Sequence, residues 1–232
     1  AMGGDETLIE GHGIFKATSS TIYSSSYKPY HAFDKTYAPD TTIGQWVSQS
    51  SSYDDASPNS SPVTSGDRSV LFNGTYGSWI QLEMPYKIIL KRMETFIRMD
   101  RDYEHATSGI LYGSNDGGST YDKVFTFDDV EVPSSFTIPK VHHVNLSKAY
   151  STFAFQITKL YGQRTFTVLG ELKFFGYREQ VTKQSVLHDG QLTLTKNLTV
   201  PRIGPALDAD DTPRRDRLVV EYNTSTNPTF DG

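Results

Sequence analysis

Arginine, tyrosine and histidine side chains recur in polar stretches of the sequence that lack a hydrophobic pattern. A sugar site needs an aromatic platform beside planar polar groups that form paired hydrogen bonds, and these residue types supply both. The alternative interpretation is that they are solvated loop residues, with arginine and aspartate pairing locally. The candidate ligand-binding residues are Arg98, Arg101, Tyr103, His105, Tyr161, Arg164 and Tyr53.

Catalytic motifs are missing from the sequence. Glu104 and His105 stand beside neither a Gly-x-Ser-x-Gly nor a His-Glu-x-x-His pattern. The pair Gly117-Gly118 is typical of a hairpin turn. His142 and His143 are neighbours in a predicted strand, so their side chains point to opposite faces and cannot share a metal ion. We therefore expect a protein that is not an enzyme.

Charge and composition exclude several classes of function. The formal net charge is −5, and the sequence has no cysteine. A nucleic-acid site would need a concentrated basic face. The one basic cluster is offset by four aspartates nearby: it consists of Arg214, Arg215 and Arg217, and the aspartates are Asp208, Asp210, Asp211 and Asp216. Disulfides and thiolate chemistry are excluded. No apolar run approaches the ~20 residues of a membrane-spanning helix.

Short strand-like runs bounded by turn residues must position these side chains. Residues 79–84 alternate apolar and polar side chains, as a half-buried strand does, and Pro85 is predicted to break that strand. Residues 153–157 and 172–175 are typical of central sandwich strands. Without a long helical stripe, this pattern predicts an all-β sandwich or barrel.

Three regions differ from this pattern. Residues 1–7 are predicted to be a disordered cloning remnant. Residues 48–69, rich in Ser, Asp and Asn, are predicted to form a long surface loop. Residues 179–232 are predicted to be a β extension and linker, because 186–200 alternate with period two around the turn Asp189-Gly190. Such a hairpin needs a packing partner, and one partner would be copies of itself in a homotrimer.

The order of short motifs resembles the coagulation-factor type C, or discoidin, family, which includes many carbohydrate-binding modules. Seven motifs occur in the family's order, and the resemblance implies an eight-stranded jelly-roll β-sandwich over residues 8–178 with a C-terminal β appendage. The matching segments are Ala17–Ser20, Ala32–Asp34, Trp46–Ser48, Trp79–Leu82, Tyr112–Gly117, Phe153–Thr158 and Leu169–Tyr177.

The resemblance also implies a metal site and a ligand site. Many members hold one structural calcium between the Ala-x-Asp loop and the glutamate of the final strand. The matching residues here are Asp34 and Glu171, and Asp40 and Thr42 lie where further oxygen ligands are expected. Ligand sites in related modules lie on loops at one end of the sandwich.

Two functions remain open from the sequence. The first is a non-catalytic, lectin-like module that recognises carbohydrate on a glycan or glycoprotein surface, outside the cell or on a virion. The second is a structural or receptor-attachment component of a viral or phage fibre, because the alternating residues 191–200 are similar to repetitive fibre shafts. An accessory domain of a larger glycan-active enzyme is a third possibility. Fold alone does not choose among them.

Overall fold

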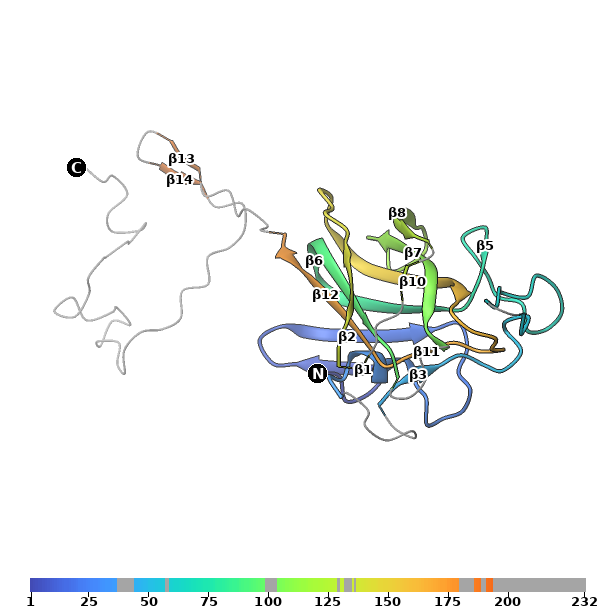
Figure 1. Ribbon diagram of the computed structural model, residues 1–232. Coiled ribbons are helices and arrows are strands. Elements are labelled where there is room, and N and C mark those ends of the chain that lie inside the picture. Colours follow the sequence, from blue (N-terminus) through green and yellow to red (C-terminus); the bar gives the residue numbers. More distant parts are fainter. Residues whose placement is uncertain are drawn as a thin grey trace. The chain divides into compact units, whose positions relative to one another are not determined.

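The computed structural model describes residues 1–36, 44–56, 59–98, 104–128, 130, 131, 135 and 137–179, and the backbone of residues 186–188 and 191–193. The chain divides into two units, residues 1–180 and residues 181–232. The described residues of the first unit form β-strands and one short 3-10 helix (Figure 1). None of the helices in the described ranges is long and apolar enough to cross a membrane.

The first unit contains short and long strands connected mostly by loops. Its elements are β1 (Glu6–Ile9), β2 (Gly13–Ser19), the helix η1 (Pro29–Phe33), β3 (Trp46–Val47), β4 (Leu71–Phe72), β5 (Thr75–Tyr76), β6 (Trp79–Phe96), β7 (Ala106–Ser114), β8 (Asp122–Phe127), β9 (Lys140–His143), β10 (Tyr150–Leu160), β11 (Val168–Leu169) and β12 (Glu171–Arg178). The predicted all-β class is confirmed.

Strand β6 belongs to both layers of the sandwich. Its first part pairs with β2 and β10 in the order β1-β2-β6-β10-β7-β8, and its second part pairs with β12 and β9. The small sheet β3-β11 lies beside these strands (Figure 1). All of these pairings are antiparallel, which is typical of sandwiches whose outer faces meet water.

The prediction that Pro85 breaks the strand was wrong, because β6 runs through it. The registered partners of β6 end at Glu83 and resume at Ile88, so Pro85 lies where the strand passes from one layer to the other. A proline is tolerated there because its missing N–H is not needed by a neighbouring strand. Gly13 lies against it, since a Cβ on Gly13 would come within 2.8 Å of the Pro85 side chain.

The core lies between the two layers. Phe153, Phe155 and Ile157 of β10 are fully buried and belong to the core cluster, and Ala154 and Gln156 between them are buried as well. The Phe153 ring meets Phe174 of β12 across the interior, with ring centroids 5.3 Å apart. The prediction that both segments are central strands of the sandwich is therefore confirmed.

Trp79 lies on the other face of the first layer. The inward side chain at the start of β6 is Ile80, whereas Trp79 is half-buried beneath Phe72 of the β4-β5 hairpin, with ring centroids 4.9 Å apart. Phe72 also contacts Tyr112 and Tyr121. The hairpin thus covers a second, smaller apolar cluster on the outside of the sheet.

Residues 1–7 are not the disordered segment that the sequence predicted. Met2 is 5% exposed and belongs to the core cluster, and its N–H donates to the carbonyl oxygen of Phe33 at 3.1 Å. Strand β1 begins at Glu6 and pairs with β2. Burial of the Met2 side chain and the pairing of β1 with β2 hold this segment in place. The sequence composition predicted no strand there.

The second unit contains one described hairpin. Strands β13 (Val186–His188) and β14 (Gln191–Thr193) pair antiparallel, with Leu187 opposite Leu192. This confirms the hairpin predicted from the period-two pattern and the Asp189-Gly190 turn. The predicted linker at 208–216 lies outside the described residues.

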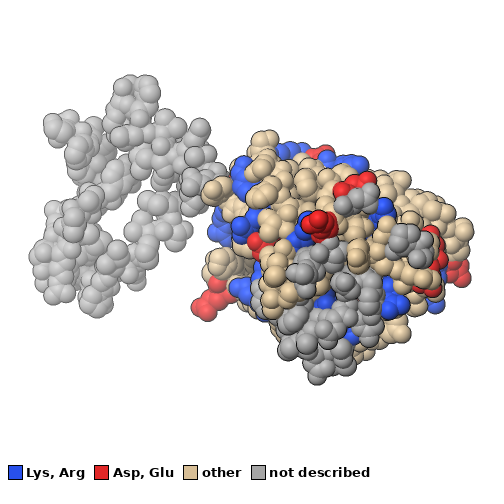
Figure 2. Space-filling model, viewed as in Figure 1, with Lys and Arg blue, Asp and Glu red and all other residues tan. Residues whose placement is uncertain are grey.

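Charged side chains of both signs share the surface of the first unit. On the face drawn in Figure 2, lysine and arginine lie among aspartate and glutamate rather than in one continuous basic area. This distribution agrees with the overall net charge of −5. It is unlike the concentrated basic surface by which proteins neutralise nucleic-acid phosphates.

Candidate functional site

Four segments that are distant in the sequence meet beside the small β3-β11 sheet. Val47 of β3 pairs with Val168 of β11, and the Tyr23 N–H donates to the Val47 carbonyl at 2.9 Å. The Thr167 hydroxyl donates to the Glu104 carbonyl at 3.2 Å. These contacts fix the loop at residues 21–27, the segment just before β7 and the segment before β11 relative to one another.

A pocket of about 170 Å³ opens between these segments. Tyr23 is 55% exposed, and its ring lies 5.7 Å from Phe166 and 6.0 Å from Tyr27, centroid to centroid. The walls of the pocket combine these aromatic rings with the charged residues Arg98 and Glu104. The lining residues are Tyr23, Tyr27, Val47, Arg98, Glu104 and Phe166.

Glu104 is the acidic centre of this pocket. It is 1% exposed, and its carboxylate lies 3.7 Å from the Arg98 guanidinium and 3.8 Å from the Arg164 guanidinium. Ion pairs of this kind compensate for the desolvation of a buried carboxylate. The cluster therefore fixes the Arg98 guanidinium at the pocket wall, while the Glu104 carboxylate itself is buried.

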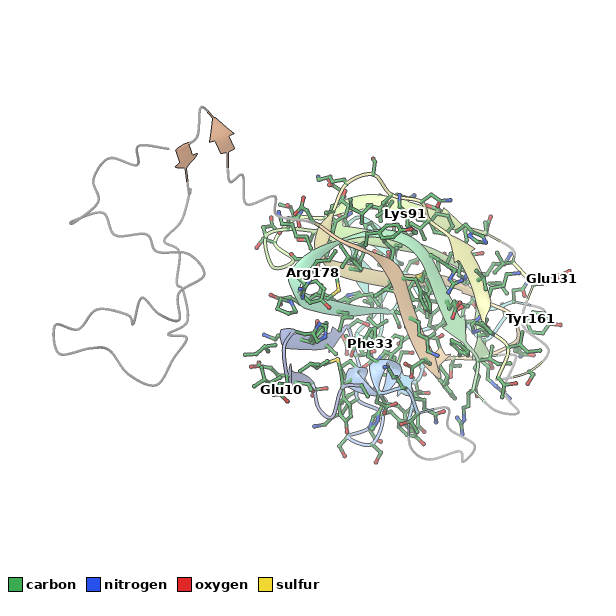
Figure 3. The ribbon with its side chains drawn as sticks, turned by 90° about the vertical axis from the view of Figure 1, so that its left-hand side faces the viewer. Glu10, Phe33, Lys91, Glu131, Tyr161 and Arg178 are labelled. Carbon is green, nitrogen blue, oxygen red and sulfur yellow. The ribbon has the colours of Figure 1, made fainter. Side chains whose placement is uncertain are left out.

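Three of the predicted ligand-binding residues lie in the Glu104 cluster or in the loop between β10 and β11. Arg98 lines the pocket, and Arg164 reaches the same carboxylate from the next loop. Tyr161 is 48% exposed but does not line the pocket, and it lies with Glu131 at the end of the sandwich away from Arg178 (Figure 3). Arg101 and Tyr103 lie outside the described residues.

The structure corrects the prediction for Tyr53. Its side chain is 1% exposed, and its hydroxyl donates to the Ile157 carbonyl at 3.0 Å inside the sandwich. The loop at residues 48–69 is anchored by such contacts, since Ser60 also bonds the carbonyl of Gly162 and the N–H of Arg164. Tyr53 is therefore an anchor for the loop and not a platform for a ligand.

His105 is likewise buried and unavailable at the surface. It is 1% exposed, and its Nε2 lies 3.4 Å from the Thr95 hydroxyl, which is 3.5 Å from His142 Nε2. Burial first, and then the positive charges of His142 and Lys140, lower the pKa of His105 to about 3. Burial and Lys140 lower the pKa of His142 to about 4. Both rings are therefore neutral core residues at neutral pH.

The predicted metal residues Asp34 and Glu171 come together at the start of β12. Both oxygens of the Glu171 carboxylate accept the Lys35 N–H, at 3.1 and 3.2 Å. Asp34 accepts the Thr36 N–H at 2.7 Å and lies 3.0 Å from His31 Nδ1. Burial, and next the charge of Asp34, raise the pKa of the Glu171 carboxyl to about 8.

These two carboxylates fit a cation, since a positive ion between them would remove the repulsion that raises the Glu171 pKa. Calcium needs six to eight oxygens. Among the residues with described side chains, no three of the types His, Asp and Glu gather as a metal cluster. The predicted ligands Asp40 and Thr42 lie outside the described residues.

Sequence reasoning missed the aromatic residues of the pocket. Tyr23 and Tyr27 stand four residues apart in a segment otherwise rich in serine, and Phe166 lies between polar threonines. Aromatic residues in a polar loop with no hydrophobic period were the available signal. What the sequence did not provide was the pairing of β3 with β11, which brings the two segments together.

Comparisons with known proteins show the fold. No protein-family model and no curated protein matches the sequence. Among solved structures, the module CBM32-3 from a family 31 glycoside hydrolase of Clostridium perfringens matches with a TM-score of 0.50 and 17% identity, over 70% of this chain and 91% of that chain. The predicted discoidin-like jelly-roll sandwich with a C-terminal β appendage is therefore confirmed.

Other solved structures are similar at a lower score. A CBM32 module of Clostridium perfringens in complex with GalNAc-β-1,3-galactose has a TM-score of 0.48 and 16% identity, over 70% of this chain and 95% of that chain. A fucolectin from striped bass has a TM-score of 0.48 and 16% identity, over 71% of this chain and 47% of that chain. The chain spans only 15% of a family 89 glycoside hydrolase that it also matches. The fibre alternative gains no support from these comparisons.

Proposed function

We propose that this protein is a non-catalytic carbohydrate-binding module whose site is the pocket lined by Tyr23, Arg98 and Glu104. The observation that carries the proposal is the convergence of an exposed tyrosine ring with a buried arginine–carboxylate pair in one pocket. The discoidin-like fold, shared with the CBM32-3 module, is consistent with such a function without establishing it.

The pocket has the two kinds of group that a sugar requires. The apolar face of a pyranose ring packs on an aromatic ring, and Tyr23 offers one that is 55% exposed. Sugar hydroxyls accept hydrogen bonds, so Arg98 can donate to a ligand hydroxyl while the buried Glu104 carboxylate holds its guanidinium in place. A volume of about 170 Å³ is smaller than the ~300 Å³ at which pockets for drug-sized ligands begin, which favours recognition of one terminal sugar residue.

The proposed partner is a glycan or glycoprotein on a surface outside the cell or on a virion. The Glu104 carboxylate is buried and ion-paired with two guanidiniums, so its proposed role is to position Arg98 and not to transfer a proton to a sugar. The proposed role of this module is to attach the protein that contains it to a surface that carries the glycan. An accessory role beside a glycan-active enzyme would use the same binding site.

We also propose that Asp34 and Glu171 hold a structural calcium ion together with Asp40 and Thr42. The buried carboxylate pair and the raised pKa of Glu171 support this proposal. When bound, calcium would supply positive charge and rigidity and no chemistry. The residues of the chain would orient the segment after η1 against the first residue of β12, as the Lys35 N–H already does.

The test is a glycan array probed with the full chain, followed by calorimetric titration of the strongest binder. Tyr23→Ala removes the aromatic platform and should weaken binding about tenfold. Arg98→Lys keeps the charge but loses the planar pair of donors, and it should weaken binding by a similar factor.

Tyr177→Ala is the matched control, because Tyr177 is 69% exposed and lies outside the pocket. It should bind glycan like the unmodified chain. The proposal fails if no glycan on the array binds, or if Tyr23→Ala and Arg98→Lys bind as tightly as this control.

A further inference from the structure

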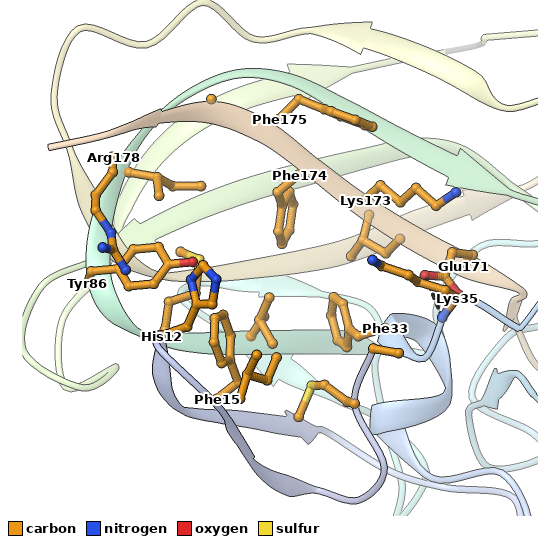
Figure 4. Close-up of a pocket in the computed structure, with 18 residues that line it drawn as sticks. His12, Phe15, Phe33, Lys35, Tyr86, Glu171, Lys173, Phe174, Phe175 and Arg178 are labelled. Atoms are coloured by element: carbon orange, nitrogen blue, oxygen red, sulfur yellow. Dashed lines mark hydrogen bonds between the residues drawn. The ribbon is translucent and has the colours of Figure 1, made fainter.

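A second and larger cavity lies where the two layers of the sandwich separate, between the β1-β2 hairpin and β12. Its volume is about 580 Å³, within the ~300 to 1,000 Å³ typical of small-molecule sites. It is bounded by the side chains of β12 on one side and those of β2 and the start of β6 on the other (Figure 4). We call it the edge groove.

The middle of the edge groove is apolar. Phe15, Phe33 and Phe174 line it in Figure 4, and Leu82, Met84 and Leu172 complete the walls. A sugar placed here would leave its hydroxyls without partners, at a cost of roughly 1–3 kcal/mol for each buried group. An alkyl chain has no polar groups to bury, so these apolar walls favour a ligand with an alkyl chain over a sugar.

The ends of the groove carry positive charge. Arg178 lies at one end beside Tyr86 and His12, with its guanidinium 3.6 Å from the centre of the Tyr86 ring (Figure 4). Lys35 and Lys173 lie at the other end, where Glu171 is the acidic group (Figure 4). The Arg178 end has no acidic residue among those that line the groove. It is therefore complementary to an anionic head group.

The groove is also long. Strand β12 runs along it from Glu171 to Arg178, eight residues that rise roughly 23 Å at ~3.3 Å each. One acyl chain fills half of the ~30 Å hydrocarbon core of a bilayer, or about 15 Å. An extended chain of that length fits between the Glu171 end and the Arg178 end.

We propose that the edge groove binds a single-chain carboxylate amphiphile, a free fatty acid, with its alkyl chain on the phenylalanine walls and its carboxylate against Arg178. His12 and Tyr86 lie beside the same head-group position. This site is distinct from the Tyr23 pocket, because none of the residues that line one lines the other. It goes beyond the proposed glycan function and does not depend on it.

The test is calorimetric titration of the full chain with dodecanoate below its micelle concentration. Octanoate should bind at least about tenfold more weakly, since each buried methylene is worth roughly fourfold in affinity. Dodecyltrimethylammonium has the same chain and the opposite charge, and it should also bind at least about tenfold more weakly. Equal affinity of the two dodecyl probes would overturn the assignment of the anionic head group.

Two substitutions locate the site. Ile9→Trp fills the groove from β1 and should abolish dodecanoate binding, whereas Leu8→Trp is the matched control because Leu8 is 73% exposed on the other face of the same strand. Arg178→Gln should weaken binding about three- to fivefold, and Lys123→Gln, on the distant strand β8, should not.

The proposal is overturned if Ile9→Trp and Leu8→Trp bind dodecanoate equally. It is also overturned if the chain binds phosphatidylglycerol vesicles but not free dodecanoate, since that result would identify a membrane surface and not a single amphiphile. Circular dichroism of each variant shows that it is folded. Glycan binding by Ile9→Trp should be unchanged, which separates the two sites.

Discussion

The buried histidine pair should make stability depend on pH, and His142→Gln is the substitution that tests it. The pKa of His142 is about 4 in the folded chain against an ordinary value of 6.5, because burial and Lys140 disfavour the charged ring. Its neighbour His105 has a pKa of about 3. Unfolding releases both rings into water, where they take up protons below pH 6.5.

The sign follows from the proton count. Because the folded pKa is depressed, the unfolded chain binds more protons between pH 6.5 and pH 4, and the free energy of unfolding falls as the pH falls through that window. At pH 5 the His142 ring is about one-tenth protonated in the folded chain and almost fully protonated in the unfolded chain. The free energy of unfolding is then lower by about 2 kcal/mol for each ring than at pH 8.

Urea denaturation at pH 8 and pH 5 measures the effect. Glu171 acts in the opposite direction, since its raised pKa favours the folded chain as the pH falls from 8 toward 4.5. The histidine contribution is therefore read as a difference between variants. His142→Gln should reduce the loss between the two pH values by about 2 kcal/mol. His143→Gln, on the exposed face of the same strand, is the control and should not.

Equal pH dependence in His142→Gln and His143→Gln would refute this reasoning, because it would mean that the buried ring gains its proton without cost. Midpoints and slopes should be compared together, because a changed slope reports a change in the denatured ensemble rather than in protonation.

Three further substitutions or treatments test the packing and the metal proposal. Tyr53→Phe removes the hydrogen bond to the Ile157 carbonyl and should lower the free energy of unfolding by about 1 kcal/mol, measured in urea. Gly77→Ala should cost more than about 2 kcal/mol, because φ is +144° and an added Cβ would meet the Ile157 carbonyl oxygen. Chelation of calcium should lower the melting temperature by several degrees, and an unchanged melting temperature in metal-free buffer would contradict the calcium proposal.

The sequence predicted the sandwich because short strand-like segments recur between turn residues. Phe153 and Phe155 stand two residues apart, so strand geometry places both rings on the inward face of β10. Pro85 was misread because local propensity cannot show that β6 leaves one layer and enters the other at that residue. Met2 was missed because burial at a chain end depends on contacts with Phe33, which is distant in the sequence.

The candidate site was predictable only in part. Arg98 and Arg164 were found from residue type, and the structure places both beside Glu104. His105 and Tyr53 were also chosen for their residue type, but both side chains are only 1% exposed in the structure. Exposure depends on tertiary packing, which residue type does not reveal. Residue type identifies what a side chain can bind, whereas only the pairing of distant segments decides whether it faces a ligand or the core.

The most direct test of the central claim is an NMR titration of the isotope-labelled full chain with the strongest glycan from the array. Binding at the proposed pocket predicts that the largest amide shifts fall on Tyr23, Val47, Arg98 and Phe166. Shifts that cluster instead on the outer face of β9 and β12, around Val141 and Tyr177, would contradict it.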